Sequence, residues 1–576
     1  MILGFLAVGV PALLIAVFNF YYRPFPTHDE AEYILLAQQH LLNFKLHGFI
    51  EGFTGLYSTR LWKPTSLPVL ELPFLILAGG DVRNTAALIE SLVALATLTA
   101  SYWILRRMLT ERAALIGTWI FGFYSWFIAY SHLNSAQMPM LACLAFGIYF
   151  VIRWFESQEL RFALWSALVL ALGATIRPVE IGTMLAVPVA YFVFVGLKNF
   201  SKHRWVWLVA ILACGLTGLL MLNGIDNFSK RILFGVFFAA TVFYFAKFRR
   251  HFDRLPTGDR ALVAAGLLFT LTVNAWFFPF YSNLLNWIFQ ASFSEEVKGF
   301  WSRSGGHFFS FIGSMLKVLY GPMAAILFIS GLIRGRSFAK NHFWLKFGAL
   351  AAAAFLPIFM GSLSYNGSYW FFFNGTYVGI LGLIVWALGR EGSFFWARMA
   401  IGTALAWLGF FGALRGAVVA PGNGTELPSC AKVVDALHSR LDLKRPLSMA
   451  VFSYGAWNAS DPDTLDRWCM HAYALEQKFP IATMSPEYFG NESFEVFMGE
   501  MRTDSDYLII SPIGAAINPA NSAGLVAFAQ KLETLAASAA IVPYGFRSLG
   551  ILEMANERKE RLLILENLRI PEAVAR

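Results

Sequence analysis

Residues 84–105 read NTAALIESLVALATLTASYWIL, and residues 113–131 read AALIGTWIFGFYSWFIAYS. Each run is apolar and roughly 20 residues long, which is the length that a helix needs to cross the hydrocarbon core of a bilayer. The short connection between them contains Arg106, Arg107 and Arg112. Two apolar runs joined by a short basic turn are typical of paired membrane-spanning helices. This stretch therefore predicts a polytopic α-helical membrane protein.

Similar runs recur over the first 416 positions and predict thirteen transmembrane helices. They lie near residues 2–20, 84–105, 113–131, 138–155, 161–177, 180–197, 205–222, 231–248, 260–279, 312–333, 343–361, 370–389 and 396–416. The first run has neither a basic segment before it nor an Ala-x-Ala cleavage site after it. We therefore interpret it as a retained helix and not as a signal peptide.

Composition agrees with a membrane location. The chain is 57% hydrophobic and only 14% charged, whereas soluble domains are usually about 25% charged. An ordinary soluble enzyme and a disordered chain are both excluded. The net charge of +9 is unevenly distributed, because residues 1–423 carry the basic excess and residues 424–576 are acidic overall. Membrane topology explains that excess, so we expect no nucleic-acid partner.

Basic residues gather in alternate connections, such as those at 106–112 and 247–260. Basic connections are normally cytoplasmic, which predicts a cytoplasmic N-terminus and external loops at 21–83 and 280–311. Thirteen crossings would then place residues 424–576 outside. We therefore expect an integral membrane protein with an external C-terminal domain.

The chain divides into two predicted domains: a transmembrane domain at 1–423, whose external loop 21–83 carries an Asp-Glu motif, and an external α/β domain at 424–576. In the second, polar residues return and strand-like runs alternate with helix-like runs. The strand-like runs are Ser448–Ser453, Asp506–Ser511 and Ser548–Glu553, and the helix-like runs are Leu427–Leu441, Asp463–Lys478 and Asn518–Ala537. Residues 556–576 are expected to form a charged helical end.

Cys430 and Cys469 are the two cysteines of the predicted external domain. An oxidising compartment would allow a disulfide between them, and two free thiols remain the alternative. The chain has no Cys-x-x-Cys, His-Glu-x-x-His or glycine-rich phosphate loop. A Walker-type ATPase, a zinc hydrolase and a Rossmann dehydrogenase are therefore unsupported.

Candidate chemistry begins just after the first apolar run, in Thr27-His28-Asp29-Glu30-Ala31-Glu32-Tyr33. On a helix, Asp29 and Tyr33 would share one face while Glu30 would point elsewhere. The segment fits an active site at the membrane face, and it equally fits a solvated helix start whose acids favour the helix dipole. About thirty residues later, Lys63-Pro64 precedes another apolar run. Lys63 could hold a phosphate as a point charge, or it could snorkel to the interface.

A first helix, a long loop opening with Asp-Glu-x-x-Tyr, and Lys-Pro before the next apolar run together resemble the C-type glycosyltransferase superfamily. The resemblance is to the bacterial branch related to protein O-mannosyltransferases, lipid A aminoarabinose transferase and lipopolysaccharide galacturonosyltransferases. It implies transfer of a sugar from a polyprenyl-phosphate donor to a glycan, lipid or protein acceptor at the external face. It also implies that Asp29 is the base, with Glu30 as neighbour and Tyr33 in support, and that Lys63 contacts the donor phosphate.

Three further residues are candidates for the donor phosphate. Thr175-Ile176-Arg177-Pro178 resembles a turn in the same family, and the alternative is an interfacial Arg177 paired with Glu180. Arg303 and His307 stand beside glycines in the predicted 280–311 loop. They could belong to a mobile lid over a lipid phosphate, or to a solvated loop.

Relatives often carry a second acidic residue in the next short external loop, whereas residues 131–139 here contain no carboxylate; His132 or Gln137 could occupy that position. We therefore expect no metal or other cofactor, with a divalent cation as the open alternative. Two other functions remain: a transporter or flippase of a lipid-linked sugar, and a membrane-anchored binding or assembly protein. The first would favour paired halves with broken helices, and the second would place function in residues 424–576.

Overall fold

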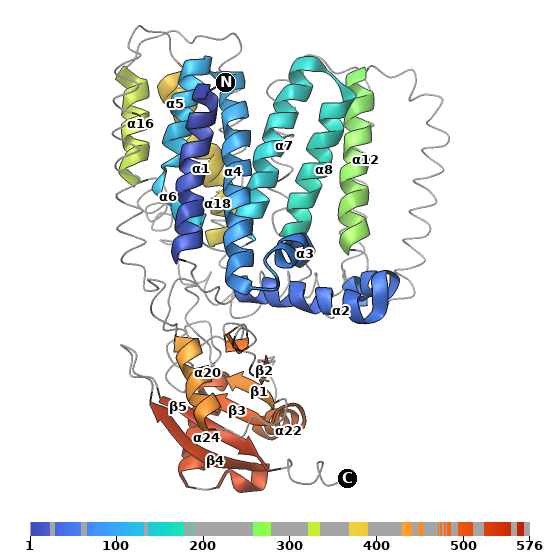
Figure 1. The fold of residues 1–576 in the computed structure, drawn as a ribbon, viewed down its shortest axis with the longest axis vertical. Coiled ribbons are helices and arrows are strands. Elements are labelled where there is room, and N and C mark those ends of the chain that lie inside the picture. Colours follow the sequence, from blue (N-terminus) through green and yellow to red (C-terminus); the bar gives the residue numbers. More distant parts are fainter. Residues whose placement is uncertain are drawn as a thin grey trace.

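The structure is a computed structural model of all 576 residues. The residues whose placement it describes are 2–22, 29–58, 66–131, 136–177, 184, 188, 257–277, 321–333, 368–389, 402, 429–440, 447–452, 470–471, 473–474, 477, 479, 481–484, 493–510, 523–538, 540–553 and 561–568. Figure 1 shows a bundle of long helices and, beyond one end of it, a small β-sheet with helices around it.

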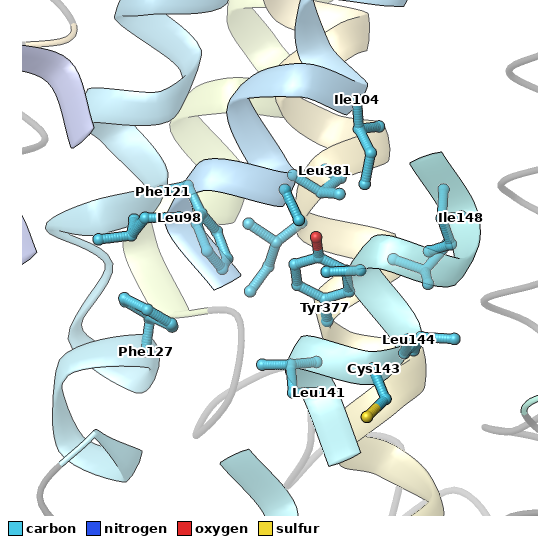
Figure 2. Close-up of a cluster of buried hydrophobic side chains, with 14 of the residues drawn as sticks. Leu98, Ile104, Phe121, Phe127, Leu141, Cys143, Leu144, Ile148, Tyr377 and Leu381 are labelled. Carbon is cyan, nitrogen blue, oxygen red and sulfur yellow. The ribbon is translucent and has the colours of Figure 1, made fainter. Parts of the chain in front are cut away.

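The bundle is built from helices whose sequences are apolar over most of their length. They are α1 (Ile2–Tyr22), α4 (Val82–Met108), α5 (Glu111–Gly122), α6 (Ser125–Tyr130), α7 (Gln137–Ser157), α8 (Leu160–Ile176), α12 (Thr257–Phe277), α16 (Gly321–Ile333) and α18 (Ser368–Leu388). Their buried side chains form one continuous apolar core. In Figure 2, Phe121 and Phe127 lie to the left of Tyr377, Leu141 lies below it, and Cys143 and Leu144 lie to its lower right.

Six predicted spans coincide closely with observed helices. They are 2–20, 84–105, 138–155, 161–177, 260–279 and 370–389. By length and composition, three helices among the described residues could cross a membrane, and they are Val82–Met108, Gln137–Ser157 and Arg260–Phe277. Four shorter apolar helices accompany them. The predicted spans at 180–197, 205–222, 231–248, 343–361 and 396–416 lie outside the described residues, apart from isolated positions. The total of thirteen therefore stays a prediction.

The single span predicted at 113–131 is wrong, because the chain leaves the helix at Phe123 and re-enters it at Ser125. Helix α1 approaches closely at this point, and a Cβ atom on Gly122 would lie 2.8 Å from the Pro11 ring. The break turns Phe121 and Phe127 toward each other, with ring centroids 4.7 Å apart, inside the core. Burial of these large rings compensates for the interrupted helix.

The ends of several helices that carry basic residues lie together. Arg106 and Arg107 occupy the last turn of α4, and Arg107 forms an ion pair with Glu156 of α7 at 3.4 Å. These ends lie on the side of the bundle opposite to the sheet (Figure 1). Which side of a membrane each end occupies remains a prediction from the basic connections.

The predicted external loop 21–83 is largely helical in the residues described. Helix α2 (Asp29–Ser58) begins at Asp29, and α3 (Leu67–Leu77) follows. The two pack together with the first turn of α4 through an apolar cluster that includes Ile34, Leu75 and Val82. Figure 1 shows α2 crossing beneath the bundle, roughly perpendicular to its long helices. Within the described residues, helices α2 and α3 of this connection therefore form a layer across one end of the bundle.

The C-terminal part contains a five-stranded sheet of order β2-β1-β3-β5-β4. The strands are β1 (Leu447–Phe452), β2 (Ile481–Met484), β3 (Tyr507–Ile510), β4 (Phe546–Glu553) and β5 (Arg561–Asn567). β1 pairs in parallel with β2 and β3, whereas β5 pairs antiparallel with β3 and β4. The accompanying helices are α20 (Ser429–Arg440), α22 (Phe494–Asp504), α24 (Ala523–Ala537) and the short η5 (Val542–Tyr544). Separate apolar clusters contain α20 on one hand and α22 with α24 on the other, as in a sheet covered on both faces.

Three of the predicted strands are observed as β1, β3 and β4, and two of the predicted helices as α20 and α24. The charged helical end predicted for 556–576 is wrong, because β5 lies there. Leu562–Leu565 form a continuous buried run between the charged ends of that strand, and β5 pairs on both sides. Pairing of β5 with β3 and β4 therefore determines the secondary structure here, although the charged residues at the strand ends had suggested a helix. The boundary at 424 and the external location of this part stay predictions.

Candidate functional site

The start of α2 holds the first group of predicted site residues. Asp29 and Glu30 are the first two residues of the helix, and their side chains lie outside the described part of the structure. Tyr33 is only 3% exposed and belongs to the bundle core. Asp29 stands one helical turn before Tyr33 in the backbone of α2. The acidic start of α2 therefore adjoins the bundle.

The second part of the site is a pair of hydrogen bonds that the sequence did not predict. The Ser66 N–H donates to the Thr175 carbonyl at 3.1 Å, and the two side-chain hydroxyls are 2.9 Å apart. The Thr175 hydroxyl also donates to the Leu172 carbonyl at 2.8 Å. Since a hydroxyl has one proton, Ser66 is the donor to Thr175 in both contacts. Both residues are buried, and the residue before α3 is thereby attached to the end of α8.

Arg177 lies two residues beyond this contact. It follows the last residue of α8, and its N–H still donates to the Gly173 carbonyl at 3.2 Å. Its backbone is extended, as expected for a residue that precedes proline. The side chain is 5% exposed. A guanidinium at this position also interacts favourably with the C-terminal end of the helix dipole. Arg177 is thus a buried cation at the end of the bundle where α2 and α3 lie.

Lys63 itself lies outside the described residues, as do Arg303, His307 and Cys469. Cys430 is placed in α20 by its backbone alone. The structure therefore brings Ser66, three residues after Lys63, next to the turn that contains Arg177. The roles of Lys63, Arg303 and His307 and the Cys430–Cys469 disulfide stay predictions.

Two buried carboxylates near this end were not among the sequence candidates. Glu71 of α3 is fully buried, and Glu90 of α4 is 1% exposed. An acid inside an apolar run is costly in a membrane and is often functional, so Glu90 within residues 84–105 was a signal available from the sequence. Glu71 stands between prolines in a shorter apolar run, where the same argument would have been weaker.

A buried asparagine links three helices at the same end. The Asn19 side chain of α1 donates to the Ser131 carbonyl at 3.0 Å and to the Ser91 hydroxyl at 3.3 Å. Asn19 and Ser131 are both buried. Ser131 follows the last residue of α6, so Asn19 fixes the position of the chain where the connection to α7 starts. Within the described residues, no group of three or more His, Cys, Asp or Glu side chains could hold a metal ion.

A family model for dolichyl-phosphate-mannose-protein mannosyltransferase matches residues 69–221 of this chain. The match begins in α3 and includes α4, α7, α8 and the turn with Arg177. Over those residues it confirms the predicted resemblance to the C-type glycosyltransferases. A comparison with curated protein sequences finds no match.

Several solved structures are similar to this one at low sequence identity. Arabinofuranosyltransferase AftD from Mycobacteria is 12% identical, with a TM-score of 0.48 over 97% of this chain and 40% of that one. ArnT from Cupriavidus metallidurans is 14% identical, with a TM-score of 0.40 over 97% of both chains. The Archaeoglobus fulgidus oligosaccharyltransferase is 13% identical, with a TM-score of 0.44 over 92% of this chain and 72% of that one. The chain therefore spans less than half the length of the arabinofuranosyltransferase. The resemblance to the C-type glycosyltransferases rests on the family model, which matches residues 69–221.

Proposed function

We propose that this chain, which resembles the C-type glycosyltransferases over residues 69–221, is an integral-membrane enzyme that transfers a sugar. The donor is a sugar carried on a polyprenyl phosphate, and the acceptor is a glycan, lipid or protein group at the external face of a bacterial inner membrane. Among the similar structures, one is of ArnT bound to undecaprenyl phosphate. In this proposal the N-terminus is cytoplasmic and residues 424–576 are periplasmic.

The observation that carries the proposal is the double hydrogen bond from Ser66 to Thr175. It attaches the residue that follows the Lys63 segment to the turn that ends in buried Arg177. Ser66 and the turn that contains Arg177 therefore meet at the end of the bundle where α2 begins at Asp29, and Lys63 precedes Ser66 by three residues in the sequence. Cations on one side and a carboxylate on the other suit an inverting sugar transfer, since the departing phosphate and the acceptor proton need opposite charges nearby.

We assign the following roles in the transfer. Asp29 would accept the proton of the acceptor group, with Glu30 beside it and Tyr33 holding the start of α2 against the bundle. Lys63 and Arg177 would neutralise the phosphate of the donor as the bond to the sugar breaks. Arg303 and His307 would approach the same phosphate from the 280–311 segment.

The activity is best tested by comparing the lipid-linked and envelope glycans of cells with and without this protein by mass spectrometry. Appearance of a species heavier by one sugar identifies both the transferred sugar and its acceptor. Asp29→Asn should abolish that product, whereas Glu51→Gln, which changes an exposed carboxylate of the same helix, should leave it unchanged. Full activity of Asp29→Asn would contradict the assignment of the base.

The phosphate contact needs its own comparison. Arg177→Gln should raise the donor concentration required for half-maximal transfer more than it changes the acceptor requirement. Arg161→Gln is the matched control, because Arg161 is exposed and lies at the opposite end of α8. Equal effects of the two substitutions would show that charge at Arg177 has no special part in binding the donor.

A further inference from the structure

Helix α2 reverses direction at Gly48. This residue has φ 77° and ψ −178° inside the helix, a conformation that glycine adopts without strain. A Cβ atom on Gly52 would lie 2.8 Å from the Phe44 Cα, and one on Gly55 would lie 3.7 Å from the Asn43 side chain. In a straight helix, positions eight residues apart are separated by about 12 Å along the axis. The segment after Gly48 therefore folds back against the segment before it, and we call residues 42–58 the α2 hairpin.

The α2 hairpin exposes large apolar side chains, in contrast to residues 31–37, which are buried. The exposed fractions are 53% for Leu42, 66% for Leu46, 76% for Phe49, 79% for Ile50 and 46% for Phe53. The rings of Phe44, Phe49 and Phe53 follow one another, with centroids 6.0 and 6.2 Å apart. An apolar surface of this kind on one protein normally has an occupant.

The position of the hairpin indicates what that occupant is. Figure 1 shows α2 crossing the ends of the long helices, with its hairpin at the far end from α4. The helices of the bundle also expose apolar side chains, such as Leu13 and Val17 of α1 and Trp165 of α8, as expected of surfaces in contact with lipid. The hairpin thus continues a lipid-facing surface at the level where the bundle ends.

Composition of the hairpin agrees with the boundary between headgroups and acyl chains. Aromatic side chains favour that layer, and Lys45 can reach the headgroups while its stem remains among apolar groups. His47 and Glu51 are four residues apart, on either side of Gly48, and His47 Nδ1 lies 3.8 Å from a Glu51 carboxylate oxygen. These two polar side chains therefore contact each other near the reversal at Gly48. Amphipathic segments of this kind bind in the plane of the interface.

We propose that the α2 hairpin inserts Phe49 and Ile50 into the outer leaflet of the membrane and so anchors α2 there. The same helix carries Asp29 at its other end, and an anchor at the hairpin restrains the tilt of the whole helix relative to the bilayer. The proposal depends on membrane location and on the geometry of α2; it does not depend on the transfer reaction.

The test places an environment-sensitive fluorophore on the full-length protein in vesicles of phosphatidylethanolamine and phosphatidylglycerol. The label is attached to Ile50→Cys, and signal from the protein without the added cysteine is subtracted. Gln39→Cys is the matched control, because Gln39 is an exposed polar residue of the same helix. Phe53→Cys gives a second, independent position in the hairpin. All three sites are exposed, so the label needs no rearrangement of the core.

Lipids with a spin label on the acyl chain close to the headgroup should quench the fluorophore at positions 50 and 53 several-fold more than at 39, with blue-shifted emission. Equal quenching at all three positions would overturn the proposal. Blue-shifted emission at 50 without quenching by the spin-labelled lipid would also overturn it, since a second copy of the chain or another protein would then cover the hairpin.

Discussion

The contact between Ser66 and Thr175 makes an asymmetric prediction about stability. Because the Thr175 hydroxyl donates to the Leu172 carbonyl and accepts from Ser66, the two single substitutions differ in what they leave behind. Ser66→Ala removes a donor and leaves the Thr175 proton still bonded, at a cost of about 1 kcal/mol. Thr175→Val keeps the shape of the side chain and leaves a buried Ser66 hydroxyl without its acceptor, at a cost of about 1–3 kcal/mol.

The double variant sharpens the test. It removes both hydroxyls, so its stability should lie close to that of Ser66→Ala. The deviation from additivity should then equal the cost of Thr175→Val alone, about 1–3 kcal/mol. Unfolding can be followed in detergent micelles by the fluorescence of the 18 tryptophans. Thr272→Val is the control, since the Thr272 hydroxyl donates within its own helix to the Leu268 carbonyl at 2.8 Å. A Thr175→Val variant no less stable than Ser66→Ala, or additive effects, would refute this hydrogen-bond assignment.

Three other substitutions test the fold around the site. Asn19→Leu should lower stability by about 1–3 kcal/mol in the same unfolding assay, because the buried Ser131 carbonyl loses its donor; an unchanged midpoint would contradict that role. Gly147→Ala should destabilise the protein, since its Cβ would overlap the Leu170 side chain of α8, whereas Gly266→Ala, with nothing within 4 Å, should be tolerated. Burial lowers the pKa of His40 from its ordinary 6.5, so the unfolded state binds a proton more readily than the folded state. The free energy of unfolding should therefore keep its full value above pH 6.5 and fall as the pH drops below 6.5. His40→Gln should flatten that decline, and an unchanged pH profile of unfolding would exclude His40 as its source.

The helices of the bundle were predictable from the sequence because a membrane leaves the backbone few alternatives. With no water to satisfy N–H and C=O groups, an apolar run of sufficient length must be helical, and the runs at 84–105 and 138–155 became α4 and α7. The break after Gly122 was not predictable, because it depends on how closely α1 approaches at Pro11. Local composition therefore predicts which segments are helical, whereas a break within a helix depends on its packing against other helices.

The site divides in the same way. Asp29 at the start of a helix and Arg177 at the end of one were predictable, because each stands at a junction between an apolar run and a polar or proline-containing segment. The Ser66–Thr175 contact was not, since nothing local marks two small hydroxyl residues as partners across the bundle. The hairpin of α2 was also missed, because an apolar segment interrupted by glycines within a long loop gives no periodic signal for a reversal.

The distance in sequence between Ser66 and Thr175 has a consequence for how the protein is made. The two residues are 109 positions apart, and α4, α5, α7 and α8 are synthesised between them. During translation, Ser66, which precedes α3, therefore acquires its hydrogen-bond partner only after Thr175 of α8 has been synthesised. A nascent chain that stops before residue 175 has α3 and α4 but not the contact that attaches α3 to α8. This end of the bundle can therefore assemble only once the first 175 of the 576 residues have been synthesised.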